Sequence, residues 1–270
     1  MAQDLRKKGL ARRVNYLWRL AATGFCFLTF AVMGITFRFA ICPILNLAVR
    51  NPRSRELAAR RVVQVSFAGF VELMRNLGCL EYRFSGDIGR LKNESLLICA
   101  NHPTLIDVVL LMSRIPNATC IVKSALTHSF ALKSPVLTSG YVSNDTGPEL
   151  VRDCARALEA GDTLIIFPEG TRTKPGVVPH IRHGAAAAAL AAQRNITPVH
   201  ITCTPPSLMK GMPWYHIPSR KMTFSIELLP DIDIAPYLEA EASVGRPAAV
   251  RRLNRRLTET LFTHPEVRNG

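Results

Sequence analysis

The chain has 270 residues, of which 48% are hydrophobic, and its mean hydropathy is +0.13. This composition excludes a disordered chain, a collagen and a small disulfide scaffold. At about 150 residues per domain, the length allows roughly two units. We expect basic and apolar N-terminal membrane-anchoring helices over residues 1–78, one globular domain over 79–264 and a tail over 265–270.

Positive charge is concentrated at the N-terminus. The chain carries 34 Lys and Arg against 20 Asp and Glu, a net charge of +14, and residues 1–61 hold twelve of the basic residues but two of the acidic ones. A basic end beside an apolar segment is typical of proteins that bind an anionic membrane surface. A nucleic-acid-binding protein would spread basic and aromatic residues over its folded domain, so we expect no nucleic acid partner.

The apolar N-terminal segment is marginal for a single membrane crossing. Residues 20–37 carry no charge, and after Arg38 the chain is uncharged again from Phe39 to Val49. A spanning helix needs about 20 apolar residues. Basic residues flank the segment on both sides, which predicts that both ends face the cytoplasm. We therefore expect a helical hairpin or in-plane anchor bending near Gly34, Arg38 and Pro43. A single crossing remains the alternative.

A capping Asn and a Pro at 51–52 predict a helix that continues to Asn76. From residue 80 onward, apolar strand-like runs alternate with helical stretches. The predicted strands are 80–84, 95–100, 118–122, 163–167, 197–203 and 222–229. The predicted helices are 103–114, 124–132, 148–160, 182–193 and 246–263. Because the central strands are apolar throughout, both of their faces should be covered, which predicts an α/β fold with a mostly parallel sheet flanked by helices.

The first candidate site is the run Asn-His-Pro-Thr-Leu-Ile-Asp, residues 101–107, which follows an apolar strand. Ligands of open α/β sheets bind at the carboxyl ends of strands. If Pro103 opens a helix, His102 lies just outside it and its ring can fold back onto Asp107. The carboxylate would then fix the imidazole tautomer and leave the other nitrogen to accept a proton from an alcohol. Taken alone, a His and an Asp five residues apart are more typical of an unrelated surface pair.

The second candidate site is the run Phe-Pro-Glu-Gly-Thr-Arg, residues 167–172, also at the end of a buried strand. Gly170 permits a tight turn and the close approach of a ligand. The guanidinium of Arg172 matches phosphate oxygens. Glu169 could hold a hydroxyl or orient the arginine. The alternative interpretation is a surface turn with an ion pair.

Together the two runs resemble the signature of the 1-acylglycerol-3-phosphate acyltransferase family, the lysophospholipid acyltransferases. The resemblance covers roughly residues 60–230 and includes a short proline block at 197–199. It implies a glycerolphosphate acyltransferase-like fold and an acyltransferase catalytic domain over 79–264. It also implies that His102 is the general base and that Asp107 orients it.

The resemblance assigns the remaining site residues and the co-substrates. It implies that the acceptor is bound by residues of the two runs and of the proline block, which forms a pocket wall. These residues are Asn101, Thr104, Glu169, Gly170, Thr171, Arg172 and Pro198. The acyl donor would be an acyl-carrier-protein or CoA thioester, and no cofactor and no metal are expected. The alcohol would attack the thioester directly, in agreement with the lack of a G-x-S-x-G nucleophile motif.

One block departs from the family pattern. The family has a glycine followed some five to six residues later by an arginine that binds the acceptor phosphate. Here residues 140–147 read Gly-Tyr-Val-Ser-Asn-Asp-Thr-Gly, and no basic residue lies between Lys133 and Arg152. An acid beside a phosphate dianion is unfavourable. An acceptor other than lysophosphatidic acid is therefore a real alternative, unless Lys174 or Arg182 supplies the missing charge.

The resemblance leads to an expected function: an O-acyltransferase (EC 2.3.1.-) of phospholipid biosynthesis, bound to the cytoplasmic face of an inner membrane, that acylates a lysolipid hydroxyl. The first alternative is a dedicated pathway that acylates a lyso-aminolipid or a polyketide-like lipid. The second alternative, from another class, is a non-catalytic lipid-binding membrane protein with a relict site. Acyl chain length and oligomeric state are not encoded in these motifs.

Overall fold

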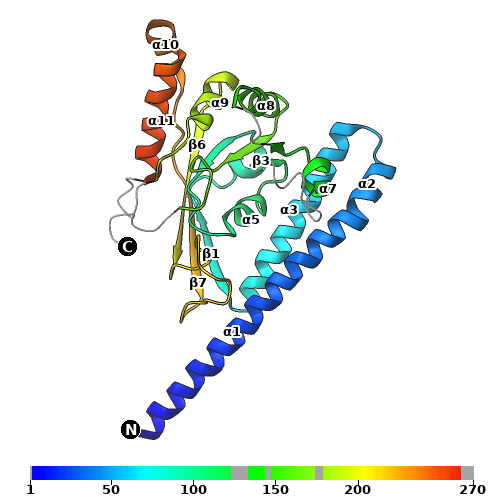
Figure 1. Cartoon of the computed structure of the whole chain (residues 1–270), viewed down its shortest axis with the longest axis vertical. Helices are drawn as coiled ribbons and strands as arrows, with labels where there is room; N and C mark the ends of the chain where they lie inside the picture. The colour runs from blue at the N-terminus through cyan, green and yellow to red at the C-terminus, as the bar shows by residue number, and fades with distance from the viewer. Residues whose placement is uncertain (1, 123–132, 144–146, 174–178, 263–270) are drawn as a thin grey trace.

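A seven-stranded sheet with helices on both faces forms the centre of the computed structural model, which describes residues 2–122, 133–143, 147–173 and 179–262 (Figure 1). The strand order is β1-β7-β6-β2-β5-β3-β4. The bounds are β1 Leu80–Ser85, β2 Leu97–Ala100, β3 Ala118–Val122, β4 Val142–Ser143, β5 Thr163–Ile166, β6 Ile196–Thr204 and β7 Met222–Leu228. All six predicted strands are present, and among the strands of the described residues the two-residue β4 is the one that was not predicted.

Parallel pairing dominates the sheet, as predicted. Every neighbouring pair of strands is parallel except β6 and β7, which are antiparallel. The carboxyl ends of β2 and β5 therefore lie side by side at the same end of the strands, with Cys99 opposite Ile166. Because both sequence runs singled out as candidate sites follow these two strands directly, the topology brings them together.

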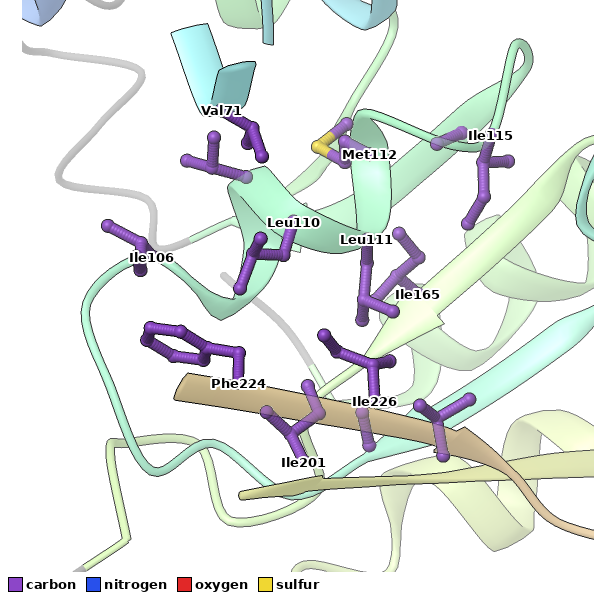
Figure 2. Packing of buried hydrophobic residues seen from close by; sticks show 14 of the residues in the cluster. Val71, Ile106, Leu110, Leu111, Met112, Ile115, Ile165, Ile201, Phe224 and Ile226 are labelled. Carbon is purple, nitrogen blue, oxygen red and sulfur yellow. The ribbon is translucent and has the colours of Figure 1, made fainter. Parts of the chain in front are cut away.

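The two faces of the sheet are buried under different helices. Side chains alternate along β2: Ile98 and Ala100 belong to one hydrophobic cluster, whereas Leu97 and Cys99 belong to the other. The helices that cover the first face include α3 (Pro52–Asn76) and α5 (Asp107–Met112). Figure 2 shows this core, in which Leu111 of α5 and Phe224 of β7 point into the same cluster.

The second face is covered by α8 (Gly147–Glu159), α9 (Gly184–Ala192) and α11 (Arg246–Phe262). The alanine-rich α9 packs directly onto the sheet, and Ala186, Ala188 and Ala189 have no exposed surface. Small side chains allow this close approach. The remaining short helices are α4 (Arg90–Asn93), α7 (Lys133–Thr138) and α10 (Ala235–Val244).

One predicted helix begins later than the sequence indicated. The sequence predicted a helix over 103–114, but α5 starts at Asp107 and ends at Met112. The carboxylate of Asp107 accepts hydrogen bonds from the amide N–H and the hydroxyl of Thr104, which closes a turn over residues 104–106 in place of a helical turn. The predicted helix at 124–132 lies outside the described residues.

The N-terminal helices form a hairpin, but its turn lies elsewhere than predicted. Helix α1 (Ala2–Thr36) continues through a π-helical segment, η1 (Phe37–Ile41), into α2 (Cys42–Ala48), so the expected bend near Gly34, Arg38 and Pro43 is wrong. Pro43 lies in the first turn of α2, and a π-helical turn absorbs the local irregularity there. The chain reverses after Ala48, and α3 returns alongside (Figure 1). Asn51 caps α3 as predicted, its side chain accepting from the amide of Ser54.

The helical stretch Arg13–Ala48 is long and apolar enough to cross a membrane, by length and composition alone, with a window of mean hydropathy 2.0 that is 17% buried. Its exposed apolar side chains include Phe25, Leu28, Val32, Ile35, Phe39, Ile44 and Leu47. The stretch is nevertheless tied to the rest of the chain. The Arg19 guanidinium donates to the carbonyls of Pro218 and Ser219, and the Trp18 indole donates to the carbonyl of Leu77.

A buried ion-pair network joins α3 to the sheet. Asp162 is 2% exposed, and its carboxylate forms ion pairs with Arg53 and Arg60 of α3. It also accepts a hydrogen bond from the side-chain amide of Asn117. Arg60 is itself 3% exposed and also donates to the carbonyls of Ser139 and Gly140. Two arginines that sequence reasoning counted among the membrane-facing charges are thus engaged inside the protein.

We predict that Asp162→Asn lowers the free energy of unfolding by about 3–5 kcal/mol, because it removes the buried counter-ion of Arg60 and leaves the more distant, half-buried Glu56 as its remaining partner. Urea unfolding in detergent measures the change. The matched control is Asp153→Asn, whose partner Arg156 is exposed, and which should cost less than about 1 kcal/mol. Equal losses of unfolding free energy in the two variants would contradict the proposed contribution of the buried network to stability.

The same carboxylate predicts a pH dependence. Burial acts to raise the pKa of Asp162, but Arg53 and Arg60 together hold it below its ordinary value. A lowered folded-state pKa contributes stability that is present above the unfolded pKa and is lost as the pH falls through the folded one. The stability gap between wild type and Asp162→Asn should therefore narrow as the pH falls below about 3.9.

Candidate active site

The site begins where β2 ends and the chain enters the 101–107 turn. Both ends of the Asn101 side-chain amide are used: it donates to the carbonyl of Ile201 and accepts from the amide of the same residue. Asn101 thus continues the pairing of β2 with β6 beyond the last regular ladder bond. Its hydrogen-bonding groups face the protein, which fixes the start of the turn that carries His102.

His102 and Asp107 form a hydrogen-bonded pair. Nδ1 of His102 lies 2.8 Å from Oδ2 of Asp107, as the sequence predicted. The Asp107 side chain is fully buried, whereas the His102 side chain is 20% exposed. Because the same carboxylate oxygen also accepts from the amide of Thr104 at 2.7 Å, it acts as an acceptor, and Nδ1 carries the proton. This leaves Nε2 of His102 as the ring nitrogen with an available lone pair.

The second sequence run lies against the first, as the topology requires. Phe167 stacks on the His102 ring with 4.3 Å between centroids. The carboxylate of Glu169 accepts from the His102 amide at 2.9 Å and from the hydroxyl of Thr173 at 2.7 Å. The Thr173 amide in turn donates to the His102 carbonyl. The histidine is therefore fixed both by its ring and by its backbone.

Glu169 is 7% exposed, and burial raises its pKa above the ordinary value for a glutamate. The hydrogen bonds from Thr173 and from the His102 amide act in the opposite direction, because they favour the ionised form. Glu169 acts here as a brace between the two loops. Acceptor binding by Glu169, as implied by the family resemblance, stays a prediction.

The Arg172 side chain is hydrogen-bonded to a third loop, which contains Leu208 and Met209. Its Nη1 donates to the carbonyls of Leu208 and Met209 at 3.0 and 3.1 Å. The amide of Leu105 donates to the same Leu208 carbonyl. Leu208 has a φ of 55°, a left-handed conformation that non-glycine residues rarely adopt, and these bonds help to hold it there. The loop over 205–209 is thus a wall of the site that sequence reasoning did not identify.

Gly170 is the residue that the turn requires. Its φ is 65°, and a Cβ at this position would lie 2.9 Å from Nε of Arg182. Arg182 therefore packs across Gly170 at the rim of the site, and its amide donates to the carbonyl of Pro168. Thr171 is exposed beside it. Of the two alternative sources of positive charge, Arg182 adjoins the site, and Lys174 lies outside the described residues.

Other predicted site residues are placed as follows. Thr104 is fully buried and serves the Asp107 carboxylate, so its substrate contact stays a prediction. Pro198 is buried inside the sheet, opposite Cys99, and its carbonyl accepts from the amide of Leu229. The departing block at 140–147 is described only in part, because residues 144–146 lie outside the described ranges.

A polar cavity of about 390 Å³ lies away from the His102–Asp107 pair, between α2, α3 and α7, with Arg38, Arg55 and Glu56 among its lining residues. The His102–Asp107 pair thus does not line this cavity. Among the described residues, no group of three or more His, Cys, Asp and Glu side chains is arranged to hold a metal ion. A metal-free reaction stays a prediction.

The arrangement suits acid–base chemistry on an alcohol. A buried carboxylate orients an imidazole whose free nitrogen is partly accessible, and such a group removes a proton from a hydroxyl and returns it to a leaving group. The structure brings His102, Asp107 and Glu169 together, and their catalytic and binding roles stay predictions. Sequence reasoning missed Thr173 and the Leu208–Met209 carbonyls. The stacking role of Phe167 could have been inferred from an aromatic residue at a strand end beside a histidine loop.

Comparison with known proteins places these loops in a familiar context. Residues 81–202 match the family model described as Acyltransferase. A 1-acyl-sn-glycerol-3-phosphate acyltransferase of Cocos nucifera is 32% identical over 117 residues, which are 41% of this chain and 38% of that protein. A lyso-ornithine lipid O-acyltransferase of Rhizobium meliloti is 25% identical over 209 residues, 67% of this chain and 70% of the relative.

A solved structure has the same fold. The crystal structure of the 1-acyl-sn-glycerophosphate (LPA) acyltransferase PlsC from Thermotoga maritima superposes with a TM-score of 0.63 at 18% identity, covering 94% of this chain and 100% of that one. At this identity the likeness establishes the fold alone. The coconut relative is matched over little more than a third of its length, so activity does not transfer from its name.

We predict that Gly170→Ala lowers stability by about 1–2 kcal/mol, because a left-handed φ is strained for any residue with a Cβ. Arg182 should also be displaced from the rim. The matched control is Gly184→Ala at the start of α9, where an added Cβ meets nothing within 4 Å and stability should be unchanged or slightly higher. Thermal unfolding of both variants measures the difference. A Gly170→Ala variant as stable as wild type would show that the turn relaxes freely.

Proposed function

We propose that this chain, whose residues 81–202 match the family model described as Acyltransferase, is an O-acyltransferase that moves a fatty acyl group from a thioester to a lysolipid hydroxyl. The observation that carries this proposal is the His102–Asp107 pair at the carboxyl end of β2, braced by Glu169. Lipid binding without catalysis would require neither the His102–Asp107 bond that fixes the tautomer nor the bond from the His102 amide to Glu169.

In the proposed mechanism, the acceptor hydroxyl lies against Nε2 of His102. Nε2 takes the hydroxyl proton while the oxygen attacks the thioester carbonyl carbon, and a tetrahedral intermediate forms. Asp107 stabilises the resulting imidazolium through the Nδ1 bond. When the intermediate collapses, the carbon–sulfur bond breaks, the imidazolium returns the proton to the sulfur, and an ester and a thiol are released. No covalent acyl-enzyme and no cofactor are needed, and the acyl thioester is a co-substrate.

The acceptor on which this mechanism acts is proposed at two levels. The general proposal is a lysolipid of the 1-acyl-sn-glycerol-3-phosphate type, as in the coconut relative's name. A zwitterionic lyso-aminolipid is the second candidate, and two specific observations favour it. No basic residue lies between Lys133 and Arg152, and the Arg172 guanidinium is bonded to two backbone carbonyls. The name of the Rhizobium relative supports the same class of acceptor.

We also propose that the enzyme associates with a membrane, at the cytoplasmic face of the inner membrane, and contacts anionic lipids there. The exposed apolar side of the Arg13–Ala48 stretch supports association with lipid. The N-terminal basic residues support a preference for anionic lipid, although Arg53 and Arg60 do not contribute to it, because they pair with Asp162. A lipid acceptor would then reach the site without crossing bulk water.

We predict that His102→Ala and Asp107→Asn each reduce acyl transfer by about 10²–10⁴-fold, the contribution expected of a general base and its orienting partner. Wild type and variants are incubated in detergent with carrier-protein and CoA thioesters and a panel of lysolipids, and products are read by mass spectrometry. The matched control is His216→Ala, an exposed histidine that contacts Tyr215 rather than the dyad, and it should retain activity.

The panel also separates the candidate acceptors. Acylation of lysophosphatidic acid would support the phosphatidate assignment, and acylation of a lyso-aminolipid in its place would support the second. If wild type transfers no acyl group from either donor, or if His102→Ala matches wild type, the acyltransferase proposal fails and the lipid-binding alternative gains.

A further inference from the structure

Helix α11 presents a compact basic surface that the proposed mechanism does not use. Arg251, Arg252, Arg255 and Arg256 are all exposed, and we call these four residues the α11 basic face. They occupy about 7.5 Å along the helix axis at 1.5 Å per residue. The opposite side of the helix, including Leu253 and Leu257, is buried against the second face of the sheet.

Within the described ranges, no ion pair involves the four arginines of the α11 basic face. Arg246, at the start of the helix, pairs with Glu241 of α10. In contrast, the described part of the chain places no acidic side chain within ion-pair distance of the four arginines. Glu259, one turn further along, is the single acid of α11. The four form two i,i+4 pairs of like charge, which disfavour the helix. An exposed surface with such closely spaced arginines is suited to binding an external anion.

A short chain of contacts connects this surface to the active site. Asn254 of α11 donates to the carbonyl of Ile181. The next residue, Arg182, donates its amide to the carbonyl of Pro168 and lays its guanidinium across Gly170. Only the segment at 181–182 therefore separates α11 from the loop that braces His102. Arg182 extends the positive charge of the α11 basic face to the rim of the site.

The position of α11 argues against a membrane as the occupant. The hydrophobic cluster that contains α11 covers one face of the sheet, and the cluster that contains Ala22 and Cys26 of α1 covers the other. Figure 1 shows α11 and the N-terminal helices on opposite sides of the sheet. A bilayer that receives the apolar side of α1 therefore does not contact the α11 basic face. This placement favours a soluble anionic molecule as the occupant.

On the basis of the proposed function, we propose that the α11 basic face and Arg182 form the docking surface for an acidic acyl carrier protein. Four arginines on the exposed side of one helix match an acidic helix of a partner, since complementary charge steers encounter and fixes register. A free CoA nucleotide is a small ligand, and such ligands bind in concave pockets. A docked carrier protein would extend its thioester-bearing prosthetic arm past Arg182 to His102.

The test compares wild type with Arg251→Glu/Arg255→Glu, using one acyl chain delivered either on acyl carrier protein or on CoA. We expect kcat/KM with the carrier-protein thioester to fall at least tenfold, and kcat/KM with acyl-CoA to change by no more than about twofold. The matched control is Arg83→Glu/Lys92→Glu, which alters net charge equally at exposed positions near the β1 edge of the sheet. This control should behave as wild type with both donors. Co-sedimentation with anionic vesicles is measured for all three proteins.

The outcomes separate this inference from the proposed function. If wild type is active with CoA but not with the carrier protein, or if Arg251→Glu/Arg255→Glu keeps its carrier-protein activity, the docking surface is wrong although the acyltransferase stands. Equal loss with both donors would also overturn it, as would loss of vesicle binding, which would assign the face to the membrane. Inactivity of wild type with every donor would instead defeat the proposed function itself.

Discussion

The buried carboxylate of Asp107 is the group around which the site is built. It has no exposed surface, and its oxygens accept from the His102 ring, the Thr104 amide and the Thr104 hydroxyl. Burying an ionised carboxylate is costly unless hydrogen bonds replace its water. Those bonds delay the start of α5 to Asp107, and they set the tautomer of the histidine. One desolvated charge therefore shapes both the backbone and the chemistry.

The surrounding loops are held by side chains that bond to backbone groups of other loops. Asn101 bonds to both backbone groups of Ile201, Glu169 accepts from the His102 amide, and Arg172 binds the carbonyls of Leu208 and Met209. Several residues that the family signature would assign to substrate thus have a mechanical role here. A side chain that holds a loop in place can also bind substrate only where part of that side chain still faces the site.

Two surfaces of opposite character lie on the two sides of the sheet. The N-terminal hairpin exposes apolar side chains, and α11 exposes arginines. The candidate active-site loops follow the central strands β2 and β5, at the carboxyl ends of those strands. Under the two proposals above, a lipid acceptor and a soluble carrier protein would bind these separate surfaces and would not compete for one of them.

The sequence by itself determined the strands, the parallel character of the sheet and the His102–Asp107 pair, because apolar runs and strand-end motifs are local signals. It could not place Thr173, Leu208 or Asn254, whose roles depend on contacts between segments far apart in the chain. Net charge was misleading for the same reason. Counting charges assigned Arg53 and Arg60 to the membrane, whereas in the folded chain both pair with Asp162, and Arg60 is buried there. The count also overlooked α11, because only the helix gathers its four arginines on one exposed face. Which charges meet a partner and which meet each other is decided by tertiary structure, since desolvation and distance govern every ion pair.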